Sequence, residues 1–374
     1  MKDISVLYFH NLDFTFKSAQ TIQVVKDYFY LSKLGIKVKI YGTYKNQEDF
    51  ILVQSYLKDS AVKIVAKKNS SYNKILLKIN FLYDLLTEQH KKIVVTRHYR
   101  KLISAIRLKQ FGIKFSLIHE MHEESFPYLF KASVSKAYTK HVFSHKKLNL
   151  LIFTNYSQLT FFKTEFGFSP KSYTVLPNGV ETEKFVNVKM EFNYVITYGG
   201  GFNKWKNVDL IFEAFSLLED KYTLRIAGGK GDIQSDDYIN FLTLKFNIDP
   251  KRIDYLGFVN NQDFPSKVLD KSNLLLLPLG DNIQSRYLTS PMKLFEYMST
   301  QIPVLAVNFP SVSLIANNTI HLSPNDANEF SKKIIEACES SKNHDILIKM
   351  NKIAEKFSYS NRSLKLHKVI NNAI

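Results

Sequence analysis

The chain has 374 residues, 45% of them apolar, and carries 51 Lys and Arg against 34 Asp and Glu, a formal charge of +17. This length and apolar content exclude a small scaffold or a disordered tail and favour two or more domains with their own cores. The charge is uneven, because residues 1–187 hold 29 basic and 14 acidic residues whereas residues 188–374 hold 22 and 20. The first half therefore suits an anionic partner.

The cysteine content and the first residues indicate the compartment. Cys338 is the single cysteine, so the chain cannot form an intramolecular disulfide. The start, MKDISVLYFH, lacks the basic segment and the uninterrupted apolar run of a secretory signal. The longest uncharged stretch, 297–325, contains three prolines, which argues against a membrane span. We expect a cytoplasmic protein.

Short apolar runs alternate with helix-length amphipathic segments along the whole chain, a pattern typical of strand–helix units that build a parallel sheet. The first unit predicts a buried strand at 4–10, a helix at 21–34 that ends near Gly35, and a second strand at 36–40. Further strands are expected at 62–65, 93–96, 115–119, 151–154 and 174–176.

A turn and a polar stretch divide the chain. Pro177-Asn178-Gly179 is a strong turn signal, and after polar residues the alternation resumes at 194–198. We therefore place a domain boundary between residues 187 and 188. The second half predicts strands at 222–226, 253–256, 273–277, 304–307 and 320–322, with helices that include 208–218 and 327–338. The fold class is α/β, with two doubly wound domains and a ligand expected in a cleft at the carboxyl ends of the strands.

Residues 289–298, TSPMKLFEYM, combine a helix start with polar side chains. Ser290 suits the N-cap and Pro291 the first helical position, so free N–H groups and the positive end of the helix dipole can bind phosphate. Glu296 lies in the second turn, where its carboxylate can accept hydrogen bonds from a vicinal diol such as a ribose. An ordinary capped helix with solvated Lys293 and Glu296 fits the same residues.

Three glycines, 199–201, directly follow the strand expected at 194–198 and precede another helix. Glycine lets the backbone approach a ligand, and Lys204 or Lys206 can reach a diphosphate. The loop matches neither phosphate-binding glycine fingerprint, because position 204 is Lys and no G-K-[ST] follows. A tight strand-to-helix turn without a ligand is the alternative.

Residues 119–124, HEMHEE, end a strand in the first half. The spacing is H-E-x-H and not the H-E-x-x-H of a helical zinc site, so we expect no metal. Glu120 and His122 are better placed to contact a sugar or to assist proton transfer. Structural polar residues remain the alternative.

Taken together, these segments resemble the family-4 retaining glycosyltransferases (glycosyl transferases group 1), which have the GT-B fold of two Rossmann-like domains. The matching segments, in family order, are Glu120-Met121-His122, the P-N-G-V run from Pro177 to Phe185, the glycine loop ending at Lys206, YLGFV at 255–259, SPMKLFEYM at 290–298 and PVLA at 303–306. Their order and spacing carry the resemblance, which is strongest from 174 to 307.

The resemblance implies an N-terminal acceptor domain at 1–187, a nucleotide-sugar domain at 188–355 and a helix at 356–374 that packs back on the first domain. Glu120 and His122 take the catalytic positions. Glu296 would hold the ribose, Lys206 the diphosphate, and Ser290 with the following N–H groups the phosphates or the sugar. The residues expected at the nucleotide sugar are Gly200, Gly201, Lys204, Lys206, Arg286, Thr289, Ser290, Met292, Lys293 and Glu296. The family's front-face transfer needs neither a metal nor another cofactor.

Two positions depart from the family pattern. Leu288 stands where the family often has a first glutamate, and Gly201 stands where an arginine usually follows the glycine loop. Arg286 and Lys204 are the candidates to replace that arginine. Members with this S-P-x-K-L-F-E-Y-M segment commonly lack the first glutamate, which favours an active enzyme. A nucleotide-sugar epimerase or an inactive GT-B partner protein stays open.

The predicted function is transfer of a sugar, with retention, from a nucleotide sugar to a polysaccharide, glycolipid or lipid-linked glycan of the bacterial surface. A basic acceptor domain suits an anionic leaflet, so we expect a peripheral protein on the inner face of the cell membrane. The candidate contacts are Lys91-Lys92, Arg97 to Lys101 and Lys131 to Lys147, although solvated helix faces would look the same. A nucleic-acid-binding protein is a remote alternative, because none of its motifs is present.

Overall fold

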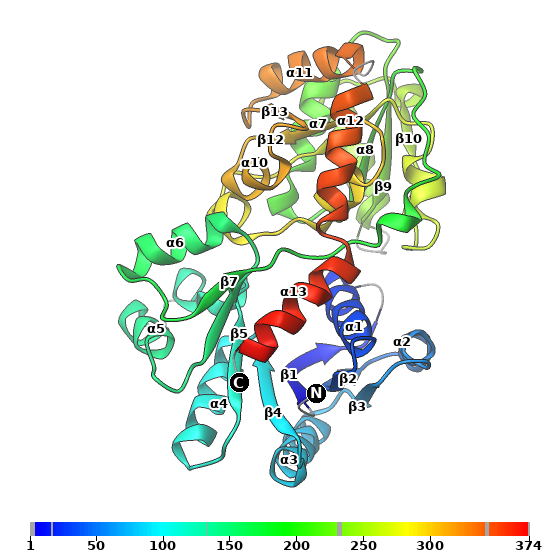
Figure 1. The fold of residues 1–374 in the computed structure, drawn as a ribbon. Helices are drawn as coiled ribbons and strands as arrows, with labels where there is room; N and C mark the ends of the chain where they lie inside the picture. The colour runs from blue at the N-terminus through cyan, green and yellow to red at the C-terminus, as the bar shows by residue number, and fades with distance from the viewer. Residues whose placement is uncertain (1–3, 16–17, 132, 230–233, 341–343, 373–374) are drawn as a thin grey trace. The chain divides into compact units, whose positions relative to one another are not determined.

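A computed structural model describes residues 4–15, 18–131, 133–229, 234–340 and 344–372. The chain divides into two compact units: unit 1 is Met1–Gly179 with Tyr359–Ile374, and unit 2 is Val180–Ser358. In each unit a parallel sheet is combined with helices (Figure 1). Unit 1 holds 31 basic and 12 acidic residues, a net +19, whereas unit 2 holds 20 and 22, a net −2.

The sheet of unit 1 has seven strands in the order β3-β2-β1-β4-β5-β6-β7. Its chain order reverses between β1 and β4, and open α/β sheets bind ligands beyond the carboxyl ends of the strands at such a point. The strands are β1 (Ile4–Asp13), β2 (Lys37–Tyr44), β3 (Val62–Lys68), β4 (Lys91–Thr96), β5 (Ser116–Glu120), β6 (Leu150–Phe153) and β7 (Tyr173–Val175).

Local signals account for several helix ends in unit 1. Asn46, Ser70 and Asn155 accept hydrogen bonds from the first turns of α2, α3 and α6, and Gly167 ends α6 at a positive φ of 69°. The helices are α1 (Ala19–Ser32), α2 (Gln47–Tyr56), α3 (Ser71–Thr87), α4 (Tyr99–Gln110), α5 (Lys136–Phe143), α6 (Tyr156–Phe166) and α13 (Tyr359–Asn372), with short turns η1 (Glu123–Ser125) and η2 (Pro127–Leu129).

The last helix, α13, belongs to the core of unit 1. It packs against α1 (Figure 1), and its Leu366 and Ile370 join the buried residues of β1 and β2. Burying such side chains contributes roughly 1.5–3 kcal/mol each. The C-terminal segment therefore stabilises the unit in which the chain begins.

Unit 2 repeats the same arrangement with six strands in the order β10-β9-β8-β11-β12-β13, so that its chain order reverses between β8 and β11. The strands are β8 (Val195–Gly200), β9 (Thr223–Gly228), β10 (Ile253–Tyr255), β11 (Leu274–Leu277), β12 (Val304–Val307) and β13 (His321–Ser323). The helices are α7 (Val208–Ser216), α8 (Gln234–Lys245), α9 (Met292–Met298), α10 (Pro310–Ala316), α11 (Ala327–Ser340) and α12 (His344–Glu355). Shorter turns are η3 (Thr182–Lys184), η4 (Lys204–Lys206), η5 (Pro250–Arg252), η6 (Pro265–Leu269) and η7 (Gln284–Leu288).

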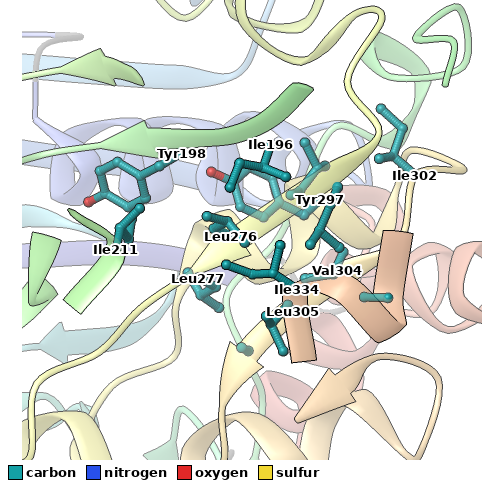
Figure 2. Packing of buried hydrophobic residues seen from close by; sticks show 14 of the residues in the cluster. Ile196, Tyr198, Ile211, Leu276, Leu277, Tyr297, Ile302, Val304, Leu305 and Ile334 are labelled. Carbon is teal, nitrogen blue, oxygen red and sulfur yellow. The ribbon is translucent and has the colours of Figure 1, made fainter. Parts of the chain in front are cut away.

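The core of unit 2 is built on its central strands. Leu276 and Leu277 of β11 and Val304 of β12 are buried together with Tyr297 of α9 and Ile334 of α11 (Figure 2). All four residues of β11 are buried leucines, as expected for a strand covered on both faces. This packing fixes α9, which carries the candidate donor-binding residues, against the sheet.

The predicted fold class is confirmed, since both sheets are parallel and doubly wound and every expected strand is present within a few residues. The chain passes from unit 1 to unit 2 after Gly179 and back after Ser358, whereas the pattern placed these points after residues 187 and 355. The physical reason is that Val180, Phe185 and Val188 are buried in the core of unit 2.

Among the described residues, no helix is both long enough and apolar enough to cross a bilayer.

Candidate active site

The glycine loop lies at the carboxyl end of β8, beside the point where the strand order of unit 2 reverses. The Tyr297 hydroxyl donates to Gly199 O at 3.2 Å and accepts from Gly199 N at 2.9 Å, so α9 holds this loop. A Cβ atom at Gly199 would lie 2.4 Å from the Phe264 ring, and one at Gly228 would lie 1.8 Å from Gly200 O. These close approaches, rather than a ligand, explain why positions 199 and 228 are glycine.

Lys204 and Lys206 flank Trp205 in η4, directly after the glycine loop. The Trp205 carbonyl accepts from Gly280 N at 2.8 Å, which fastens this turn to the loop after β11. Lys204 is exposed, whereas Lys206 is half-buried with its Nζ 3.9 Å from the centre of the Trp205 ring. No carboxylate pairs with Lys206 among the described residues.

The surroundings of Lys206 favour its neutral form. Burial and the nearby charge of Lys293 lower the pKa of Lys206 to about 8, against the opposing effect of Glu296. The structure thus brings together Lys206, Lys293 and Glu296, three of the residues expected at the donor. Two cations near one carboxylate leave a positive excess that suits an anion.

Glu296 is buried in α9, with an exposed fraction of 8%. Its Oε2 accepts from Lys293 Nζ at 2.6 Å, and the same Nζ lies 3.2 Å from the centre of the Phe264 ring. The Glu296 carboxylate is therefore positioned by a lysine one turn away and retains acceptor capacity for a diol.

The start of α9 differs from the predicted one. The helix begins at Met292 and Pro291 is the N-cap residue, so the expectation of Ser290 as N-cap is wrong. Pro291 has ψ 112°, an extended conformation that keeps it outside the helix, and its carbonyl accepts from Leu294 N at 3.0 Å. Ser290 is buried, and Thr289 N donates to Gln284 O at 2.9 Å.

Arg286 lies in η7, where its guanidinium has two partners. Nε and Nη2 donate to the Asp281 carboxylate, and the guanidinium carbon lies 4.8 Å from the centre of the Phe309 ring. The neighbouring Leu288, at the position of the absent glutamate, is buried. A diphosphate contact from Arg286 remains a prediction that requires competition with Asp281.

Glu120 and His122 lie at the carboxyl end of β5 in unit 1. His122 Nε2 is 3.1 Å from Glu120 Oε1. Burial lowers the pKa of His122 to about 4, with the charge of Arg97 acting in the same direction. Burial alone would raise the pKa of Glu120, but His122 and the charges of Arg362 and Arg97 hold it well below its usual range. At neutral pH the pair is thus a carboxylate beside a neutral imidazole.

The other histidine of this motif has a structural environment. His119 is fully buried, its Nδ1 is 2.8 Å from Thr96 Oγ1 and its Nε2 is 3.0 Å from Ser125 Oγ. Both ring nitrogens are therefore engaged. In the part of the chain that the structure describes, no three His, Cys, Asp or Glu side chains are grouped to hold a metal ion.

Residues 193–340, which include the glycine loop and α9, match the family model described as Glycosyl transferases group 1. This segment of the chain is therefore similar to the group 1 glycosyl transferases. No curated protein sequence matches the chain.

Solved structures resemble the chain over its whole length. Sucrose-phosphate synthase from Thermosynechococcus elongatus is 13% identical with a TM-score of 0.76, and the match covers 99% of both chains. HepE from Anabaena, solved with UDP-glucose, is 11% identical with a TM-score of 0.73 over 98% of this chain and 99% of its own. The lipopolysaccharide outer core galactosyltransferase WaaB is 17% identical with a TM-score of 0.68 over 100% of both chains. The chain shares the GT-B fold with these proteins.

Outside residues 193–340, the sequence interpretation missed the residues around Glu120. Arg97 and Lys101, expected as membrane contacts, are buried with exposed fractions of 9% and 8%, so that expectation is wrong for both. Arg97 follows β4 directly, and the Lys101 ammonium lies 4.1 Å from the centre of the Phe9 ring. The position of Arg97 directly after a buried strand could have indicated its place, because polar residues there lie at the ligand-binding edge of the sheet.

Proposed function

We propose that this chain is a retaining glycosyltransferase that transfers a sugar from a nucleotide sugar to a glycan or lipid-linked acceptor in bacterial surface-glycan synthesis. The observation that carries the proposal is the grouping of Lys206, Lys293 and Glu296 beside the glycine loop. The proposed donor is a UDP-sugar, since HepE, a protein of the same fold, was solved with UDP-glucose.

Each side chain has a distinct part in the proposed reaction. Glu296 accepts hydrogen bonds from the ribose hydroxyls, and Lys206 neutralises charge as the diphosphate leaves. The diphosphate oxygen takes the acceptor's proton on the face where the acceptor attacks, which retains the anomeric configuration. Glu120 and the neutral His122 are proposed to contact the reacting sugar. The ammonium groups of Lys206 and Lys293 supply the stabilisation that a metal gives in other transferases, so we propose a metal-independent reaction.

Binding of the donor tests this proposal through its pH dependence. UDP-glucose affinity is expected to fall about tenfold per pH unit above pH 8, because Lys206 has a pKa of about 8 and binds the diphosphate when protonated. An ordinary lysine, with a pKa of 10.5, would hold the affinity constant to about pH 10. Isothermal titration calorimetry from pH 7 to 9.5 measures the effect, with Lys206→Met expected to flatten the profile.

The exposed Lys251 gives the matched control, and Lys251→Met should leave the profile unchanged. A wild-type affinity that is constant to pH 9.5 would contradict the role of Lys206. Turnover of the bound UDP-sugar in EDTA, with the product anomer assigned by NMR, tests transfer, retention and metal independence. Binding without turnover would favour the inactive partner protein that Leu288 suggests.

We also propose that unit 1 attaches to an anionic membrane surface through α3. Five large apolar side chains of α3, spaced three or four residues apart, are 55–70% exposed: Tyr72, Ile75, Ile79, Tyr83 and Leu86. Such spacing places them on one face of the helix. The other face is anchored, because Phe81 stacks on Phe9 with ring centres 4.0 Å apart. Lys74 and Lys78 are exposed on the same helix and suit an anionic leaflet.

The double variant Ile75→Ser/Ile79→Ser is expected to reduce binding to phosphatidylglycerol vesicles by about tenfold or more, since both side chains lose apolar burial in the membrane. Flotation at low and high salt measures the binding. Leu244→Ser, which changes an exposed apolar residue of unit 2, should bind as the wild type does. Equal flotation of the wild type and the double variant would exclude α3 as the contact.

A further inference from the structure

Unit 1 buries more cations than carboxylates. Among its described residues, four buried side chains are cationic and two are anionic. The cations are Lys26, Arg97, Lys101 and Arg362, and the carboxylates are Asp27 and Glu120. An unpaired buried charge lowers the stability of the fold, so this excess of buried cations needs a compensating anion or a functional role.

Arg97 and Arg362 differ sharply in how their charge is compensated. Arg362 Nη1 lies 2.8 Å from Asp27 Oδ2, its Nη2 lies 3.3 Å from Glu120 Oε1, and its Nε donates to Pro177 O at 2.7 Å. Arg97 is 9% exposed, yet its Nε and Nη1 are buried without a hydrogen-bond partner among the described residues. The two carboxylates pair with Arg362, and Arg97 keeps unused donors.

Two further groups near Arg97 also have unused hydrogen-bonding atoms. Tyr8 and His10 lie on β1 with ring centres 6.0 Å apart, and the electrostatic influence of Arg97 reaches both. His10 Nδ1 is buried without a partner in the described part of unit 1, and the Tyr8 hydroxyl, which lies close enough to Arg97 to accept from it, makes no other hydrogen bond there. The Gln20 amide nitrogen lies 2.7 Å from His10 Nε2, so Nε2 accepts and the proton of the neutral ring is on Nδ1. The cluster of Arg97, Tyr8 and His10 thus offers donors.

The position of these donors is the one where a ligand is expected. His10 is near the end of β1, and Arg97 follows β4, the strand that pairs with β1. The strand order of unit 1 reverses between these two strands, and open α/β sheets bind ligands beyond their carboxyl ends at this point. A set of donors around a guanidinium matches a ligand whose atoms only accept, as the oxygens of an oxyanion do.

We propose that Arg97, His10 and Tyr8 bind an oxyanion, a phosphoryl or carboxylate group, on the acceptor. The proposal rests on the proposed glycosyl transfer, and it names the chemical class of the acceptor: a phosphorylated or uronic acid-containing glycan. The guanidinium binds two oxygens of the group, and the phenol and the imidazole N–H donate to the same anion.

Binding of inorganic phosphate and of glucuronate to the full chain, measured by calorimetry, tests the site and separates the two sources of the oxyanion. We expect one of these probes to bind and Arg97→Gln to weaken it at least tenfold. Arg107→Gln, which changes an exposed arginine of α4, should bind as the wild type does. Absence of binding by both probes, or equal binding by the wild type and Arg97→Gln, would overturn the proposal.

Thermal unfolding separates a binding role of Arg97 from a structural one. Because Nε and Nη1 make no hydrogen bond in the described structure and Arg97 acts on Glu120 only through its charge, Arg97→Gln should lower the melting temperature far less than Arg362→Gln, which breaks two ion pairs. A decrease as large as that of Arg362→Gln would assign Arg97 to the fold and overturn the proposal. Lys206→Gln should lose UDP and keep the Arg97-dependent anion, whereas Arg97→Gln should keep UDP. Failure of UDP binding alone would therefore reject the donor site and not this one.

Discussion

Replacing Arg362 by glutamine is expected to lower the free energy of unfolding of unit 1 by about 3–5 kcal/mol, the usual cost of removing one partner from a buried ion pair. Arg362 is 3% exposed and lies within 2.8 Å of Asp27 in α1 and 3.3 Å of Glu120 in β5. Without its guanidinium, the buried Glu120 carboxylate would lose a compensating charge, and Asp27, whose pKa burial raises to about 7 even beside Arg362, would take up a proton.

The position of Arg362 makes the effect larger than the loss of two contacts. Its Nε donates to the Pro177 carbonyl, so one side chain of α13 joins α1, β5 and the end of the segment after β7. Loosening α13 would also expose Leu366 and Ile370, which are buried in the core of unit 1. Unit 1 should then unfold at a lower denaturant concentration.

Urea unfolding of the full chain, followed by far-UV circular dichroism, measures this destabilisation. Lys365→Gln is the control, because Lys365 is exposed on the same helix and should change the free energy by less than about 0.5 kcal/mol. A midpoint for Arg362→Gln equal to that of Lys365→Gln would show that the ion pairs do not stabilise unit 1.

The alternation of apolar runs and amphipathic segments was sufficient to predict the fold, because a strand buried on both faces leaves a short apolar run such as Leu274–Leu277 in any sequence. The crossing points were harder to place. Val180 and Phe185 belong to a segment with little regular structure, and only the packing in the folded unit shows that they join the core of unit 2.

Charged side chains were the main source of error at the candidate sites. A lysine or arginine in a basic cluster is usually solvated. For this reason Arg97 and Lys101 were expected to contact a membrane. Both are buried beside strand ends, where tertiary packing and not composition decides exposure. The exposed apolar face of α3 was equally hidden, because the spacing of Ile75 and Ile79 also fits a helix face turned toward the core.

Replacing Glu296 by alanine is expected to reduce UDP-glucose affinity and turnover at least about a hundredfold. A hydrogen bond to a charged group contributes roughly 1.5–3 kcal/mol, and the Glu296 carboxylate is proposed to make two with the ribose. Glu329→Ala is the matched control, since Glu329 also pairs with a lysine three residues away, Lys332, at 2.8 Å but on an exposed helix face. Unchanged affinity of the Glu296→Ala protein would reject the ribose role.

The Glu296→Ala substitution should also change the pH dependence of UDP-glucose binding. Glu296 raises the pKa of Lys206, so its removal should move that pKa below its value of about 8. The residual affinity for UDP-glucose should then begin to fall at a lower pH than in the wild type. Loss of ribose contacts alone would reduce affinity equally at every pH. A displaced pH profile, measured by calorimetry, therefore shows that Glu296 and Lys206 act on one bound donor, whereas a parallel profile shows that they do not.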